Sequence, residues 1–251
     1  MRLFTHVLEE LSLRGRGFSE GFMKDARLPK PTWPDEPRSV TVLKGQQFEA
    51  GKNIFKFGKR VHLEGALNEG SLRIAPASSY GDPSLNYAIR DDELSFTIEI
   101  HPQEIKVQKV DKQTLKPVGE IAVKGNLTMT MKCATDYWVF CLALTYPLRA
   151  YDDFETDACL VIRQPGLFYK RLLDAMRAKT GLDEAIIGAV DYLDPLNSKR
   201  GEVKPFFAKH FRYAYQKEIR VVWCPKSPVE KLQPLILTLG SLTHVAEILL
   251  P

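Results

Sequence analysis

The sequence predicts an α+β fold: a mixed, largely antiparallel sheet core with a few flanking helices. Apolar and polar residues alternate over much of 94–133, as they do in strands with one buried face. Two segments, Arg60–Glu69 and 167–178, instead place apolar residues at helical spacing, with Gly70 and Gly181 as C-terminal caps. Hydrophobic residues make up 44% of the 251 residues, which is enough for a sizeable core.

Residues 1–37 are predicted to form an N-terminal helical extension and a Pro-rich connector, ahead of a single α+β domain over 38–251. Leu3, Val7 and Leu11 recur near helical spacing, and four prolines lie within 28–37. The start of the chain carries acids where a secretory leader has its apolar centre, and no apolar run approaches the ~18 residues of a membrane span. We therefore expect a cytoplasmic protein with no membrane partner.

The first unit of the domain is predicted as strand, helix, glycine, strand. A strand candidate lies at 39–43, and a second at 53–57 precedes the helix over Arg60–Glu69 and a strand over 71–74. The loop over 76–83 is rich in hydroxyl groups and turn-forming residues. Asp82 is expected to cap a short helix that begins at Pro83.

The sheet is predicted from the period-two segments 94–100, 104–110, 120–124 and 127–133. The nearly continuous apolar run 137–145 should be a central strand buried on both faces. Further apolar strands are expected at 158–162, 185–193 and 235–239, and 243–250 fits either a helix or a strand. Four carboxylates within 152–157 are interpreted as a solvated helix start, although they leave divalent cation binding open.

No metal site is predicted. The cysteines show no spacing typical of zinc ligands and are expected to be buried thiols, and the histidines are scattered. The charge is more informative. Residues 1–60 carry twelve basic and seven acidic side chains, residues 199–220 seven and two, and residues 61–198 fourteen and twenty. Two basic segments that meet would suit the phosphates of a dinucleotide or a nucleic acid, whereas a mixed solvated surface would bind nothing.

The segment 206–223 concentrates the candidate functional residues. Glu218 and Arg220 lie two apart on a predicted strand and therefore share a face. A carboxylate beside a cation stays ionised, so Glu218 can serve as an acceptor, a base or a stabiliser of positive charge, or the two residues form a structural ion pair.

The same segment interleaves cationic and aromatic residues. This pattern suits nucleic-acid binding and equally describes a buried face. The candidate nucleic-acid-binding residues are Lys209, Arg212, Tyr213, Tyr215 and Lys217.

Three short motifs carry a family resemblance over about 54–223. They are Gly70-Ser71-Leu72, then Tyr80-Gly81-Asp82-Pro83, and finally the run from Tyr215 to Arg220. Together they resemble an uncharacterised bacterial domain family that is found in phage-defence and toxin neighbourhoods. The resemblance implies a defence setting and allows an antitoxin or other defence-system partner protein.

The first strand–helix–Gly–strand unit, together with a late glutamate, is also similar to ADP-ribosyltransferases that modify nucleic acids. That resemblance implies NAD as cofactor and a nucleic-acid or protein acceptor. Glu218 would be the catalytic carboxylate, and Lys56, Phe57, Tyr80 and Arg220 would contact the cofactor. Two alternatives stay open: a non-catalytic nucleic-acid-binding protein that uses 199–220, and a metal-dependent nuclease that uses the acids at 152–157.

Overall fold

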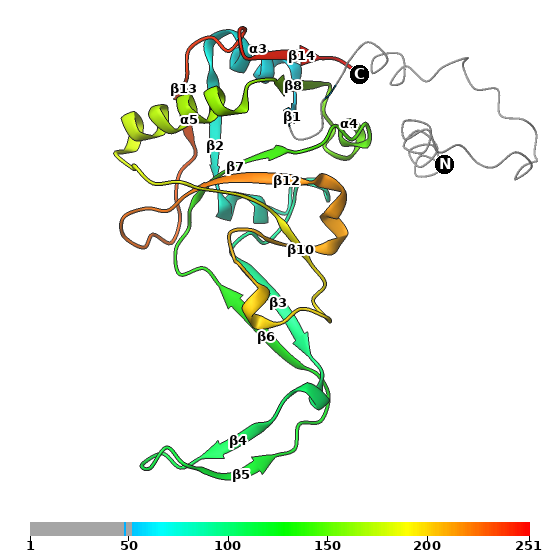
Figure 1. Cartoon of the computed structure of the whole chain (residues 1–251), viewed down its shortest axis with the longest axis vertical. Coiled ribbons are helices and arrows are strands. Elements are labelled where there is room, and N and C mark those ends of the chain that lie inside the picture. The colour runs from blue at the N-terminus through cyan, green and yellow to red at the C-terminus, as the bar shows by residue number, and fades with distance from the viewer. Residues whose placement is uncertain (1–47, 49–51) are drawn as a thin grey trace, which may run out of the picture.

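The structure is a computed structural model that describes Phe48 and residues 52–251 (Figure 1). The extension predicted for 1–37 and the strand candidate at 39–43 lie outside the described residues. The described part confirms the α+β prediction, because an eight-stranded, antiparallel sheet carries helices on one of its faces. Strand β7 (Trp138–Ala143) lies at its centre, as the apolar run 137–145 predicts.

Strand β7 organises the sheet. Along one path the described strands follow the order β13, β2, β7, β1, β8, β14, and β12 joins β7 to β9. All pairings within this sheet are antiparallel. The bounds are β1 Ile54–Gly58, β2 Ser71–Pro76, β8 Ala158–Ile162, β9 Ile186–Ala189, β12 Glu218–Trp223, β13 Leu235–Thr238 and β14 Ala246–Leu249.

Helices α3 (Arg60–Glu69) and α5 (Pro165–Thr180) pack on the same core beside this sheet. Their buried apolar residues meet those of β1, β2, β7, β8 and β12, and the fully enclosed members include Phe168, Leu172 and Met176. Both helices end at the predicted glycines, and Gly70 adopts the left-handed φ of 71° that a helix C-cap favours. Helix α3 has the predicted bounds, and Gly70 caps its C-terminus with an amide that donates to the Ala66 carbonyl, whereas Lys59 makes no side-chain cap at its N-terminus.

One edge of β7 is divided between two strands, which leaves a fork. Strand β1 pairs with β7 only at Phe55 and Ala143, whereas β2 pairs at Ala75 with Val139 and at Pro76 with Trp138. Between these pairings no described strand faces Cys141 on that edge. The opposite edge of β7 is paired with β12 along all six residues. The sheet is therefore continuous on one side of β7 and open on the other.

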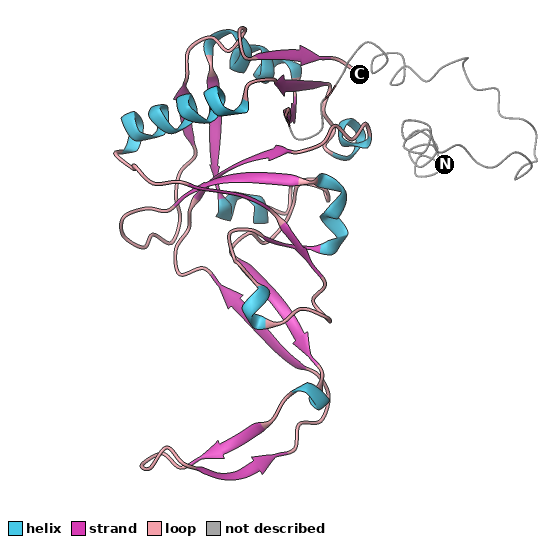
Figure 2. Ribbon diagram, in the orientation of Figure 1, coloured by secondary structure: helices cyan, strands magenta, loops and turns pink. Residues whose placement is uncertain are grey.

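A ribbon projects from the body, as Figures 1 and 2 show. It consists of β3 (Ser95–Ile100) paired with β6 (Leu127–Lys132), and then of β4 (Val107–Val110) paired with β5 (Pro117–Ile121). Strands β10 (Asp191–Leu193) and β11 (Ala208–His210) form a separate parallel pair. The remaining elements are α4 Arg149–Asp153, η1 Ala77–Gly81, η2 Pro102–Glu104, η3 Arg200–Glu202 and η4 Phe211–Gln216.

The structure corrects several predicted boundaries. The strand predicted at 104–110 begins at Val107, because η2 occupies the preceding residues and starts with Pro102. The strand predicted at 185–193 is two strands, since β9 pairs with β12 while β10 turns to pair with β11. The segment 243–250 contains the strand β14.

Two polar segments also differ from prediction. Asp82 does not cap a helix; it accepts a hydrogen bond from the Ser84 amide (2.8 Å) in a turn. Only part of the acidic cluster belongs to a helix start: Asp152 lies in the first turn of the short helix α4, Asp153 ends that helix, and Glu155 and Asp157 follow it. Cys159 is buried as predicted, whereas the other three cysteines are only half-buried.

Candidate functional site

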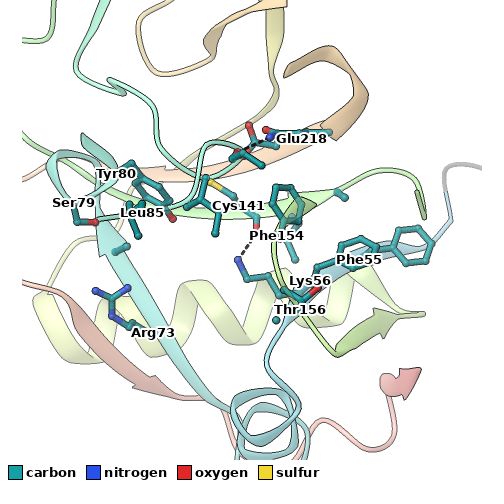
Figure 3. A pocket seen from close by; sticks show the side chains of 18 of the residues that line it. Phe55, Lys56, Arg73, Ser79, Tyr80, Leu85, Cys141, Phe154, Thr156 and Glu218 are labelled. Atoms are coloured by element: carbon teal, nitrogen blue, oxygen red, sulfur yellow. Dashed lines mark hydrogen bonds between the residues drawn. The ribbon is translucent and has the colours of Figure 1, made fainter. Parts of the chain in front are cut away.

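A cavity of about 620 Å³ opens at the fork beside β7 (Figure 3). Its walls come from β1, β2, β7, the start of β12 and the loop over 79–93. The polar and aromatic side chains that line it include Lys56, Phe57, Arg73, Tyr80, Glu93, Cys141, Phe154, Lys209, Gln216 and Glu218. Five residues that the sequence singled out therefore share one cavity: Lys56, Phe57, Tyr80, Lys209 and Glu218.

Strand alternation explains why Glu218 reaches this cavity. Val221 and Trp223 belong to the core that contains α3 and α5, so Glu218 and Arg220 face the other way. The pairing of β12 with β7 sets Arg220 opposite Cys141. The predicted shared face is confirmed by the contact between Arg220 Nη2 and Glu218 Oε2, which is 3.2 Å long.

Two buried cations contact one oxygen of Glu218. Lys209 Nζ donates to Oε2 at 3.1 Å, and Arg220 Nη2 donates to the same oxygen at 3.2 Å. The backbone amide of Glu218 donates to the Tyr192 hydroxyl at 2.8 Å, which anchors the start of the strand. The carboxylate is 12% exposed, so it is mostly enclosed yet borders the cavity.

A second carboxylate, Glu93, completes the cluster. Its oxygens accept from Arg220 Nη2 at 2.8 Å and pair with Nη1 at 2.7 Å, a bidentate arrangement. Glu93 also lies 3.6 Å from Lys209 Nζ. Arg220 is fully buried, and Glu93 and Lys209 are each 4% exposed. The enclosed cluster therefore sets two cations against two carboxylates.

This arrangement keeps Glu218 ionised. Burial alone would raise the pKa of its carboxyl, but the charges of Lys209 and Arg220 and hydrogen bonds from Lys209 and the Cys141 thiol outweigh burial and lower the pKa to about 2. Burial lowers the pKa of Lys209, yet the charges of Glu218 and Glu93 more than offset it and raise the pKa. Both partners are therefore charged at neutral pH.

Lys56 occupies the fork itself. Its ammonium donates to the Cys141 carbonyl at 2.9 Å, on the edge of β7 that no described strand covers (Figure 3). Burial lowers the pKa of Lys56. Within the described part of the chain no carboxylate lies within ion-pairing distance of Lys56 or of the exposed Arg73. These two cations border the cavity without a direct ion-pair partner among the described residues, and the Glu218 charge acts on Lys56 from a longer distance.

Aromatic rings form another wall. Phe57 packs against Tyr151 and Tyr146 at ring-centroid distances of 5.3 and 5.6 Å, and it lies 6.4 Å from Phe154. Tyr80 comes from the opposite side, and burial raises the pKa of its phenol well above the ordinary value, so it remains protonated. The cavity thus combines flat apolar surfaces with charged groups, as small-molecule sites commonly do.

The predicted nucleic-acid-binding residues do not form one exposed surface. Arg212 and Lys217 are exposed, but Lys209 belongs to the buried cluster and Tyr213 is 1% exposed beneath it. Tyr215 is half-buried, and Arg149 lies over its ring at 3.9 Å. Lys209 and Tyr213 are buried because the Lys209 ammonium pairs with Glu218 and lies 4.7 Å from the Tyr213 ring centroid.

Sequence reasoning missed Glu93, Arg73 and Cys141. Glu93 follows Arg90, Asp91 and Asp92, a run that is indistinguishable in sequence from a solvated turn. Arg73 alternates with the buried Leu72 and Ile74, and this alternation was the available signal that it faces away from the helices. Cys141 lies at the cavity because β1 and β2 diverge beside it, and local sequence does not encode that divergence.

The described residues contain no cluster of three or more His, Cys, Asp or Glu that is suited to a metal ion. None of the helices in 52–251 is both long and apolar enough to cross a membrane. Comparison with known proteins returned no matching family profile, no matching curated protein and no matching solved structure.

Proposed function

We propose that this chain cleaves the bond between nicotinamide and ribose in NAD and transfers ADP-ribose to an acceptor. The observation that supports the proposal best is an ionised carboxylate, Glu218, at the edge of a cavity that is also lined by aromatic rings and by two cations, Lys56 and Arg73, that make no ion pair with a described residue. Sites that stabilise a developing positive charge need such a carboxylate in an enclosed environment.

The residues present fit NAD. A cavity of about 620 Å³ lies within the range of roughly 300–1,000 Å³ that is typical of small-molecule sites. Lys56 and Arg73 supply positive charge for a diphosphate, and Phe57 and Tyr80 supply ring faces for a planar base. Arg220, which was predicted to contact the cofactor, is fully buried among Glu93, Glu218 and the Phe206 carbonyl, and we assign it to support of Glu218.

The bond change is balanced within the proposed reaction. The ribose–nicotinamide bond of NAD breaks, and its electron pair remains on the ring nitrogen, which becomes neutral. An oxygen or nitrogen of the acceptor forms the new bond to the ribose carbon and releases its proton. The ionised Glu218 attracts the positive charge that grows on the sugar.

The class of acceptor and the biological setting are proposed separately from the reaction. A nucleic acid and a protein remain the acceptors under consideration, and the phage-defence or toxin setting rests on the family resemblance. A protein that only binds nucleic acid through 199–220 is the competing idea, and the burial of Lys209 and Tyr213 gives it no added support.

The test is incubation of the full chain with NAD that carries label in its adenylate part, together with cellular RNA, DNA and protein. We expect released nicotinamide and label on one class of polymer. The variant Glu218→Gln should release nicotinamide far more slowly. Wild-type protein that releases none and labels nothing, yet retains nucleic acid in a salt-dependent manner, would establish the binding protein instead.

A further inference from the structure

We propose that Glu93 is a positioning residue for the candidate carboxylate: it holds Arg220 and Lys209 so that Glu218 keeps an orientation and a charge suited to the cavity. This inference rests on the proposed function. Glu93 comes from the polar segment before β3, far from β12 in sequence, and it lies at the same cavity wall as Glu218.

Glu93 restricts the orientation of the Arg220 guanidinium. Arg220 presents both terminal nitrogens to Glu93, at 2.7 and 2.8 Å, and its Nη2 also reaches Glu218 at 3.2 Å. A bidentate pair restricts rotation of a planar guanidinium more than a single contact does. The Arg220 Nη1 donates in addition to the Phe206 carbonyl at 3.0 Å. Glu93 therefore fixes the plane from which Arg220 meets Glu218.

The backbone around Glu93 is itself fixed. The buried Tyr137 hydroxyl donates to the Glu93 carbonyl at 2.7 Å, and Tyr137 belongs to the segment that leads into β7. The Glu93 backbone is thus anchored by the residue directly before β7, the strand that borders the cavity. Such a support is what a carboxylate needs if its position is to remain constant while a ligand binds.

Glu93 also balances the charge of the buried cluster. Without Glu93, the buried Lys209 and Arg220 would face one carboxylate, and the enclosed cluster would change from neutral to singly positive. An enclosed positive charge opposes the growth of further positive charge on a ribose nearby. Glu93 hence allows Glu218 to be held by two cations without losing its attraction for the substrate.

The kinetic experiment measures nicotinamide release by the full chain with Glu93→Gln. We expect kcat to fall by roughly 10-fold to 100-fold, while KM for NAD changes little, because Glu93 acts through Glu218. Adding Lys209→Met to Glu93→Gln returns the enclosed cluster to zero net charge, so the double variant should release nicotinamide faster than Glu93→Gln alone. Glu93→Asp, which keeps the charge, should also be faster than Glu93→Gln.

A second readout is independent of NAD. Burial and then the Glu218 charge raise the pKa of the Cys141 thiol to about 12, and the Glu93 charge contributes in the same direction. Glu93→Gln should therefore increase the rate at which iodoacetamide alkylates Cys141 at pH 9 severalfold. Peptide mass spectrometry measures this rate. Cys224 is the internal control, because burial alone raises the pKa of its thiol and its rate should not change.

Two results would overturn the inference. One is a raised KM with kcat unchanged, which would place Glu93 among the substrate contacts. The other is unchanged Cys141 alkylation in a folded Glu93→Gln protein, which would show that Glu93 does not set the potential at the site. If the wild type releases no nicotinamide, the proposed function fails, and the alkylation rates still decide whether Glu93 sets the charge balance around Glu218.

Discussion

Replacing Glu218 with Gln removes the charge beside the cavity and nearly preserves the side-chain shape. A unit charge about 4 Å from an opposite charge is worth about 4 kcal/mol at an effective dielectric constant of 20. Lys209 and Arg220 contact the same carboxylate oxygen and offset part of that attraction. We therefore expect a loss of about 3 kcal/mol in transition-state stabilisation, which corresponds to a rate decrease of roughly 10²-fold to 10³-fold.

The substitution also affects folding, so the assay needs a matched control. Breaking a buried ion pair costs about 3–5 kcal/mol, and in a chain of this size 1 kcal/mol lowers Tm by about 2–4 °C. Lys209→Met removes the 3.1 Å contact with Glu218 but retains the carboxylate. The two variants should therefore lose comparable stability, and only Glu218→Gln should lose the charge that acts on the substrate.

The assay is the initial rate of nicotinamide release at saturating NAD and at a temperature below the unfolding transition of both variants. Circular dichroism at that temperature establishes that each variant is folded. We expect Glu218→Gln to be at least about tenfold slower than Lys209→Met. Equal rates for the two folded variants would refute a role of the Glu218 charge in catalysis.

Three further predictions concern the cations, a buried acid and a glycine. Lys56→Met and Arg73→Gln should each raise KM for NAD by roughly 10-fold, measured by nicotinamide release, because each removes a positive charge from the cavity; unchanged KM in both variants contradicts their contact with the diphosphate. Burial, and then the Glu93 charge, raise the pKa of Asp91 from 3.8 to about 6 in the folded chain. Between pH 4 and 6 the unfolded chain therefore binds fewer protons than the folded chain, and the free energy of unfolding falls as pH rises through that window. Asp91→Asn should therefore gain about 2 kcal/mol relative to wild type at pH 8 but little at pH 4, as urea unfolding at the two pH values will show; an equal effect at both would argue against the shift. Gly70→Ala should lower Tm by about 6 °C or more, since φ is 71° and a Cβ would lie 2.3 Å from the Gly240 carbonyl oxygen; a Tm equal to that of wild type is the contrary outcome.

The fold was predictable where local pattern and tertiary environment agree. Arg60–Glu69 has an apolar stripe and a glycine in the left-handed region, and these two signals define the helix without help from distant residues. The run 137–145 is short and apolar on both faces, a pattern typical of a central strand. The shared face of Glu218 and Arg220 likewise follows from strand geometry alone.

The rest depended on contacts between distant segments. Lys209 lies in a basic, aromatic run that suits an exposed binding surface, yet Glu93 and Glu218 draw it into the interior. The strand expected at 185–193 divides because two different partners, β12 and β11, pair with its halves. Neither outcome has a local signature, since the decisive partner is elsewhere in the chain.

The fork in the sheet separates the cations of the site into two groups with different chemistry. Where β12 covers β7, Arg220 and Lys209 meet carboxylates, so their charge holds Glu218 ionised and is not available to a ligand. Where β1 and β2 diverge, the Lys56 ammonium contacts the Cys141 carbonyl and the Phe140 ring and makes no ion pair with a described carboxylate, so it can meet an anion. A substrate that presents a negative diphosphate and a sugar that becomes positive needs both groups, at different walls of one cavity. Closing the fork with a continuous strand would satisfy the Cys141 carbonyl and remove the reason for Lys56 to lie there.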